Sequence, residues 1–275
     1  TNLTRDHLDY HKTRESYRDV KARLFEELAP SAIAVLNSED PIADVYRERT
    51  KARVIRYGLT GSPEVGAEVL ERSLQGTTVR LRLPGTSHEL RTRLIGRHNV
   101  SNLLAAAACA WGLGVAPEQV VRGLEGVASV RGRLEPVEAG QPFAVLVDYA
   151  HTDDALANVL RTVREVCTGR ILTVFGCGGD RDRGKRPLMG STVEALGDLA
   201  FVTSDNPRSE EPEAILREIL AGMSRPDRCR VHVDRAEAIR AAVREARPGD
   251  AVLIAGKGHE TYQIFRDGVK PFDDR

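Results

Sequence analysis

The stretch FAVLVDYAHTDDALANVLRTVREVCTGRILTVF (residues 143–175) decides the fold class of the second half of the chain. It opens with a short apolar run, continues with apolar residues at helical spacing and closes with a second apolar run. A strand, a helix and a strand in this order predict a parallel pair of strands with the helix crossing one face.

The same alternation continues toward the end of the sequence. We expect strands at 143–148, 170–175, 199–203, 229–233 and 251–255, and helices at 153–166, 187–196, 212–223 and 235–246. This pattern predicts an α/β fold with a mainly parallel sheet covered by helices on both faces.

The first half of the chain has a different order of predicted helices and strands. We expect an amphipathic helix at 13–29, a strand at 32–36, alternating strands between 53 and 95, an alanine-rich helix at 99–112 and a helix from Pro117. The change after Arg133 and the length of 275 residues predict two domains, 1–133 and 134–275.

Composition narrows the class of protein. Forty basic residues balance forty acidic ones, so net charge gives no reason to expect nucleic acid or an anionic membrane as a partner. The four cysteines form no C-x-x-C pair, which favours reduced thiols in a cytoplasm. No apolar run approaches the roughly 20 residues that span a bilayer.

Four polar or glycine-rich segments follow predicted strands: 148–151, 176–179, 205–208 and 256–260. Ligands of such sheets bind at the carboxyl ends of the strands, so this edge predicts a site. The segment 179–185 also fits the start of a phosphate-binding loop, but Arg186 replaces the Ser or Thr that would hold magnesium. We favour a rigid turn that presents Arg181 or Arg186 to a carboxylate; internal salt bridges are an equal alternative.

Tyr17, Val20, Leu24, Phe25 and Leu28 recur at helical spacing and form the apolar stripe of the first predicted helix. Lys21 is unusual because its spacing places it on or beside that stripe. Such a lysine ordinarily extends outward into water. The alternative is a lysine of lowered pKa that becomes a carbamate and a magnesium ligand. Asp6, His7, Asp9 and His11 lie just upstream and could either complete a magnesium shell or form a solvated loop.

Several polar residues have both a structural and a binding interpretation. Asn99 either caps the alanine-rich helix or contacts a nucleobase. Asp148 and His151 follow a strand, where they are suited to ribose or phosphate. Asn206 and Arg208 flank Pro207 as donors, or the three residues form a simple turn.

Seven motifs in order resemble the Mur ligase family. They are TRDHLDYH (4–11), VKARLF (20–25), GRHNVSN (96–102), DYAHT (148–152), the segment 176–189, DNPR (205–208) and GKGHE (256–260). The resemblance implies a central ATPase domain, in which this chain begins, followed by a Rossmann-like domain that binds an amino acid. Asp153, where the family usually has proline, is a departure that a helix start tolerates.

The resemblance also implies an activity and its residues. It implies a cytoplasmic, monomeric ligase of peptidoglycan synthesis, and so of cell shape and division, that uses ATP and Mg²⁺ to add meso-diaminopimelate to UDP-N-acetylmuramoyl-L-alanyl-D-glutamate. Its partners would be these substrates, without nucleic acid or membrane. The implied catalytic residues are Lys21, His7 and His151, of which His7 and the carbamylated Lys21 are magnesium ligands and His151 lies near the phosphates. Nucleotide contacts would come from Asn99, Arg133 and Asp148, and acceptor contacts from Arg181, Asn206, Arg208, Gly256 and Glu260.

The reaction follows from the substrates. ATP phosphorylates the D-glutamyl carboxylate to an acyl phosphate, and the acceptor amine displaces phosphate. The resemblance also implies a phosphate loop and a further domain upstream of residue 1, so we expect this polypeptide alone to be inactive. Alternatives are a lysine-adding Mur ligase, a folylpolyglutamate synthetase and a non-catalytic binding module.

Overall fold

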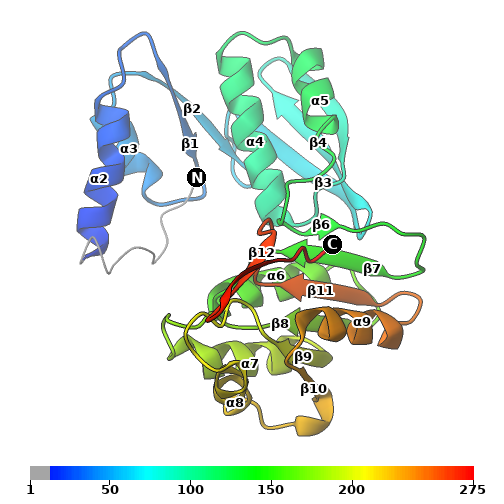
Figure 1. The fold of residues 1–275 in the computed structure, drawn as a ribbon. Helices are drawn as coiled ribbons and strands as arrows, with labels where there is room; N and C mark the ends of the chain where they lie inside the picture. The colour runs from blue at the N-terminus through cyan, green and yellow to red at the C-terminus, as the bar shows by residue number, and fades with distance from the viewer. Residues whose placement is uncertain (1–12) are drawn as a thin grey trace. The chain divides into compact units, whose positions relative to one another are not determined.

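The computed structural model describes residues 13–275, which form two compact units that divide between Ala128 and Ser129 (Figure 1). Arg133 therefore belongs to the second unit. Each unit has its own sheet and its own apolar core.

The first unit contains a five-stranded sheet in the order β1-β2-β3-β4-β5. Its strands are β1 (Ile33–Asn37), β2 (Arg53–Gly58), β3 (Val65–Ser73), β4 (Gly76–Leu83) and β5 (Thr86–Thr92); its helices are α2 (Arg14–Glu26), α3 (Ala43–Arg49), α4 (Arg97–Gly112) and α5 (Pro117–Glu125). The first three strands run parallel, and β3, β4 and β5 pair antiparallel. The predicted elements of this half are confirmed, with ends that shift by a few residues.

Alternation along β4 produces the core of this unit. Val79, Leu81 and Leu83 are buried, whereas Arg80 and Arg82 are exposed, as the period of two predicts. Apolar side chains of α4 pack on the same core. Helix α4 begins at Arg97 after Gly96, whose φ of 97° is in the left-handed region that favours glycine.

Helix α2 differs from its prediction in which side chains it buries. Ala22 is fully buried, but Val20 and Leu24 of the predicted apolar stripe are 50% and 66% exposed. Phe25 stacks on Tyr46 of α3 at 4.7 Å between ring centroids, so α2 packs on α3 through a narrow contact. The expected broad buried stripe is therefore wrong for the described residues.

The second unit contains a six-stranded sheet in the order β10-β9-β8-β11-β7-β6. Its strands are β6 (Glu135–Pro136), β7 (Ala144–Asp148), β8 (Ile171–Phe175), β9 (Leu199–Thr203), β10 (Cys229–His232) and β11 (Ala251–Ala255), and a separate hairpin joins β12 (Tyr262–Phe265) to β13 (Gly268–Pro271). Strands β7 to β11 run parallel, and only the short β6 pairs antiparallel. The predicted α/β architecture is confirmed.

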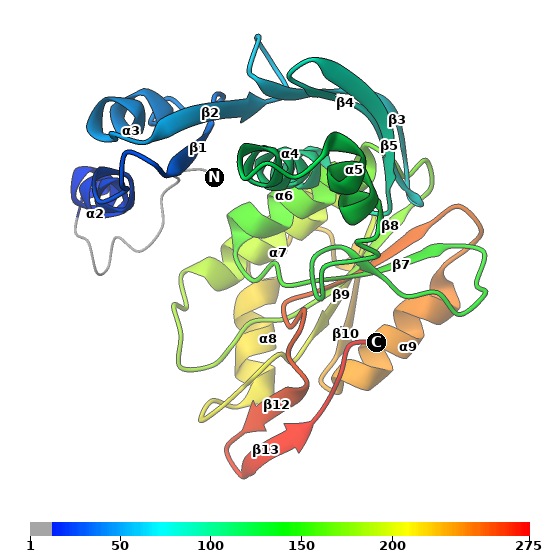
Figure 2. The same cartoon turned by 90° about the horizontal axis from the view of Figure 1, so that it is seen from above.

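Helices cover both faces of this sheet. They are α6 (Asp153–Arg164), α7 (Lys185–Leu196), α8 (Pro212–Leu220) and α9 (Arg235–Glu245), and a single 3-10 turn, η1 (Pro226–Arg228), precedes β10. Helices α6, α7 and α8 pack in a row on one face, while α9 packs on the other (Figures 1 and 2). The strands β7, β8, β9 and β11 are apolar nearly throughout because both of their faces are covered.

No helix among residues 13–275 is both long enough and apolar enough to cross a membrane.

Candidate functional site

The polar segments that directly follow β7, β8, β9 and β11 are the strand exits of the second sheet. They meet at one edge because β7, β11, β8 and β9 are neighbours and run parallel. The amide of Gly256, after β11, donates to the carbonyl of Asp148 at the end of β7 (3.1 Å). The amide of Gly179, after β8, donates to the carbonyl of Asn206 after β9 (2.9 Å). The predicted gathering of these segments at the carboxyl edge is therefore what the structure has.

Glycine is required where the exits of β8 and β9 touch. A Cβ on Gly179 would lie 1.9 Å from the carbonyl oxygen of Pro207, and one on Gly176 would lie 2.2 Å from that of Thr203. Neither oxygen belongs to a side chain that can turn away. Any larger residue would separate the two strand exits.

Lys257 is the central cation of this edge. Its side chain is fully buried, and its ammonium donates to Asp205 Oδ1 (3.3 Å), Asn206 Oδ1 (3.0 Å) and Glu260 Oε2 (3.1 Å). The ring of Tyr262 lies 5.7 Å from the same nitrogen. The three N–H groups of the ammonium thus have three oxygen acceptors.

Asn206 connects this cation to the β12–β13 hairpin. Its Oδ1 also accepts from the amide of Ile264 (3.1 Å), and its Nδ2 donates to Glu260 Oε2 (3.0 Å). Gln263, next to Ile264, donates through its side-chain Nε2 to the backbone carbonyl of Asp205 (2.8 Å). The hairpin therefore fixes the strand exit that follows β9.

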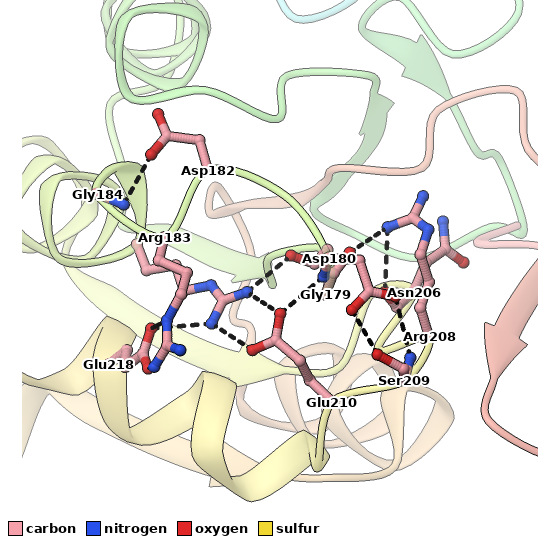
Figure 3. A network of polar contacts seen from close by, with 12 residues as sticks. Gly179, Asp180, Asp182, Arg183, Gly184, Asn206, Arg208, Ser209, Glu210 and Glu218 are labelled. Carbon is pink, nitrogen blue, oxygen red and sulfur yellow. Dashed lines mark hydrogen bonds and ion pairs between the residues drawn. The ribbon is translucent and has the colours of Figure 1, made fainter.

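Arg208 ends that exit in a left-handed backbone conformation, with φ of 54°. Its amide donates to the carbonyl of Ile264 (2.9 Å), and its Nη1 donates to the carbonyls of Gly179 (2.8 Å) and Asn206 (3.4 Å) (Figure 3). Within residues 13–275 its Nε and Nη2 donate no hydrogen bond, so one side of the guanidinium fork stays available.

Two arginines of the loop after β8 form ion pairs within the fold. Arg186 is fully buried and pairs with Glu210 (2.8 and 2.9 Å) and Glu218 (2.9 Å). Arg183 pairs with the same Glu218 (Figure 3). The hydrogen bond from Arg186 lowers the pKa of Glu210 to about 2. For Arg186 and Arg183, internal salt bridges are the correct alternative.

This loop is not a phosphate cradle. The amide of Asp180 donates to Glu210 Oε1 (2.7 Å), and that of Gly184 donates to Asp182 Oδ1 (2.8 Å). Together with the bond from Gly179, these contacts direct three amides of the loop to acceptors within the fold and not to a bound anion. Arg181 is exposed and makes no hydrogen bond or ion pair with the described residues.

The exit of β7 carries the remaining candidates of this unit. Asp148 is buried and accepts from the amides of Leu134 and Ala150 (2.8 Å each). The guanidinium of Arg133, next to Leu134, lies 5.4 Å from the ring centre of Tyr149. Asp148 therefore fixes the turn that carries Arg133.

His151 is exposed and its ring is oriented by Tyr149. Its Nδ1 lies 2.9 Å from the carbonyl of Tyr149, and the two rings pack edge to face at 4.7 Å. A carbonyl only accepts, so Nδ1 carries the proton, and Nε2 of the neutral ring is left as an acceptor toward solvent.

The candidates of the first unit are less well assembled. Lys21 is exposed, with its amine 5.0 Å from the ring centre of Tyr17. It therefore lacks the buried position on which the carbamate interpretation depended. It lines a cavity of about 280 Å³ together with Asp40. The segment with Asp6, His7, Asp9 and His11 lies outside the described residues. Among residues 13–275, no three His, Cys, Asp or Glu side chains cluster as metal ligands.

Asn99 does not cap its helix, and that alternative is wrong. It is the third residue of α4, is buried, and donates through Nδ2 to the carbonyl of Ile95 (2.8 Å). The helix begins before Asn99 because Gly96 provides the left-handed turn.

Sequence reasoning missed Lys257 and gave no role to Asp205. The available signal was a lysine between two glycines directly after a fully apolar strand, where a charged side chain has little access to water. A buried lysine needs carboxylate partners; Glu260 lies three residues further along the same segment, and Asp205 follows β9.

Both halves of the chain match domains of one known protein family. The Mur ligase middle domain model matches residues 1–110, and the Mur ligase glutamate ligase domain model matches residues 132–258. The chain belongs to the Mur ligase family. The predicted family is thereby confirmed, in both halves of the chain.

Individual relatives agree with the family. The UDP-N-acetylmuramoyl-L-alanyl-D-glutamate--2,6-diaminopimelate ligase of Geobacillus thermodenitrificans is 48% identical over 100% of this chain and 58% of its own length. A solved structure of a ligase with the same name has a TM-score of 0.72 at 38% identity and covers 99% of this chain and 57% of its own. The chain thus spans less than two thirds of these relatives.

A folylpolyglutamate synthase from Mycobacterium tuberculosis shares the fold alone. It has a TM-score of 0.69 at 22% identity and covers 93% of this chain and 60% of its own. The likeness reflects a common architecture, on which different acceptors can be bound.

Proposed function

We propose that this chain carries the acceptor-binding part of an ATP-dependent ligase that adds diaminopimelate to UDP-N-acetylmuramoyl-L-alanyl-D-glutamate. The 48% identity to a ligase of that name supports the proposal. The observation that carries it is the pattern of unused polar atoms at the exits of β9 and β11.

Those unused atoms complement one end of an amino acid. Arg208 has Nε and Nη2 unbound by the described residues, and a guanidinium edge pairs with a carboxylate through two parallel hydrogen bonds. Oε1 of Glu260 likewise accepts no hydrogen bond from the described residues, so it can accept one from an ammonium. A carboxylate and an ammonium on one carbon are what diaminopimelate has and lysine lacks at the far end of the side chain.

Further acceptor contacts would come from neighbouring exits. We assign Arg181, which is exposed, to the other carboxylate of diaminopimelate. We assign Asn206, through its remaining Nδ2 hydrogen, to the end of diaminopimelate that Arg208 and Glu260 contact. Gly256, with φ of 119° and a Cβ direction 3.9 Å from Asp205, leaves room for the acceptor backbone beside the strand end. Lysine would leave Arg208 without its carboxylate, which penalises its binding.

The chemistry follows from the poor reactivity of a carboxylate. The γ-phosphoryl group of ATP passes to the D-glutamyl carboxylate and gives an acyl phosphate and ADP. The amine of diaminopimelate attacks the acyl carbon, loses a proton and expels phosphate. We assign Arg133 and His151 to the nucleotide, with Asp148 placing Arg133 through the amide of Leu134, and Asn99 as a contact from α4.

We assign a magnesium ligand role to His7 and a carbamate to Lys21. His7 as a magnesium ligand lies outside the described residues. Lys21 is exposed, and a carbamate there would be stabilised by a bound metal and not by burial. Magnesium would neutralise charge on the transferring phosphoryl group, and we assign it no step in this chain.

We assign residues 1–133 to a central ATP-binding domain and 134–275 to the amino-acid-binding domain. We further propose a cytoplasmic, monomeric enzyme. The split between Ala128 and Ser129 and the separate sheets support a two-domain description.

Acceptor-dependent phosphate release tests the proposal. The complete gene product that contains this chain is incubated with ATP, Mg²⁺ and UDP-N-acetylmuramoyl-L-alanyl-D-glutamate, with diaminopimelate, lysine or no acceptor. We expect turnover with diaminopimelate alone. Turnover with lysine instead would keep the family and overturn the acceptor, and no turnover with either would favour a binding module.

A further inference from the structure

We infer that Lys257 is a positioning residue for the acceptor: its ammonium sets the orientation of Asn206 and Glu260, so that their unused atoms face the incoming amino acid. The inference rests on the proposed function, because it assigns the acceptor to this edge of the sheet. Lys257 itself has no free donor and would touch no ligand.

The hydrogen bonds decide which way the Asn206 amide faces. Lys257 Nζ and the amide of Ile264 can only donate, and both contact the same atom of Asn206, at 3.0 and 3.1 Å. That atom must be the oxygen, so Nδ2 points toward Glu260. Without Lys257, the amide would lose one of the two donors that hold it in this orientation.

Lys257 also determines which oxygen of Glu260 is available. Glu260 Oε2 accepts from both Lys257 (3.1 Å) and Asn206 (3.0 Å), whereas Oε1 accepts from no described residue. The carboxylate is therefore held by one oxygen and presents the other. A ligand ammonium would find its acceptor already in place, which reduces the ordering that binding requires.

Charge gives a second reason for the arrangement. Two carboxylates, Asp205 and Glu260, face one ammonium that is fully buried. Removing the cation would leave two acids close together with no cation in direct contact with both, and they would move apart. The incoming amino acid would then lose a fixed hydrogen-bond donor, Asn206 Nδ2, and a fixed hydrogen-bond acceptor, Glu260 Oε1.

The test is the variant Lys257→Met in the complete gene product, which keeps the length of the side chain and removes its charge. We expect the KM for diaminopimelate to rise by about tenfold to a hundredfold, as for a lost hydrogen bond to a charged group, with kcat changed much less. We also expect a smaller preference for diaminopimelate over lysine.

A double variant separates positioning from loss of folding. If Lys257 acts through Glu260, Lys257→Met should add little to the KM of Glu260→Gln when the two are combined. Arg170→Met is the matched control, because Arg170 pairs with Asp250 (2.8 Å) just before β8, at the amino edge of the same sheet. It should lower the melting temperature and leave the KM unchanged.

The outcomes are distinguishable from failure of the proposed function. If the unaltered protein does not use diaminopimelate, the proposed function is wrong. If it does, and Lys257→Met keeps the original KM, the inference is overturned. A KM that rises equally in Lys257→Met and Arg170→Met, or changes that add fully in the double variant, would also overturn it in favour of a purely structural role.

Discussion

The exits of β8 and of β9 contain similar residues and use them in opposite ways. After β8, Arg186 and Arg183 are bound to Glu210 and Glu218, and the amides of Gly179, Asp180 and Gly184 donate within the fold. Arg181 is the exception in this loop, because it pairs with no described residue. After β9, Arg208 is held by one nitrogen and leaves the rest of its guanidinium unbound by the described residues. Arginine content therefore does not identify a binding site; the number of donors left after the fold has formed does.

The contrast predicts different consequences for the two arginines. Arg186→Met should lower the free energy of unfolding by about 3 kcal/mol, because it leaves two carboxylates without their buried cation. Urea denaturation measures this directly. A loss below about 1 kcal/mol would mean that the charges of this loop are not structural.

The contact between the two exits can be broken at its glycine. Gly179→Ala should cost about 2 kcal/mol and weaken acceptor binding, because the new Cβ overlaps the carbonyl of Pro207. Gly123→Ala in α5, where nothing lies within 4 Å of the added Cβ, should instead stabilise by about 0.5–1 kcal/mol. Equal melting temperatures for the two variants would contradict this close approach.

The pH dependence of the unfolding free energy tests the ion pair after β8, with a smaller expected effect than the substitutions above. Glu210 has a pKa lowered from 4.5 to about 2, mainly by its hydrogen bond from Arg186. A lowered carboxyl pKa stabilises the fold at pH above 4.5, and this stabilisation is lost as pH falls toward 2. The unfolding free energy of Arg186→Met should therefore fall less between pH 5 and 2 than that of the unaltered protein. Parallel curves would show that Arg186 does not set this pKa.

The sequence predicted the second unit well because its signals are local. Apolar runs of strand length and helical spacing gave the ends of β9 and β11 to the residue, and the parallel arrangement brought the four exits to one edge. The gathering of DNPR and GKGHE follows from that topology.

The details of the site were less predictable because they depend on pairings across the sheet. The local sequence hints that Lys257 is buried but does not indicate its pairing with Asp205. It also does not indicate that Arg186 is fully paired while Arg208 is not. Periodicity likewise failed for α2, where Val20 and Leu24 are exposed despite their apolar spacing. Burial of a helix face depends on what packs against it, which spacing alone does not specify.

The preference for diaminopimelate over lysine in an arginine variant tests the central claim most directly. The ratio of kcat/KM for the two acceptors is measured for the complete gene product, for Arg208→Met and for Arg183→Met, whose arginine pairs with Glu218. We expect Arg208→Met to lower the ratio by about tenfold or more, as for the loss of a charged hydrogen bond, and Arg183→Met to leave it unchanged. An unchanged ratio in Arg208→Met would contradict the assignment of this arginine to the carboxylate at the far end of the diaminopimelate side chain.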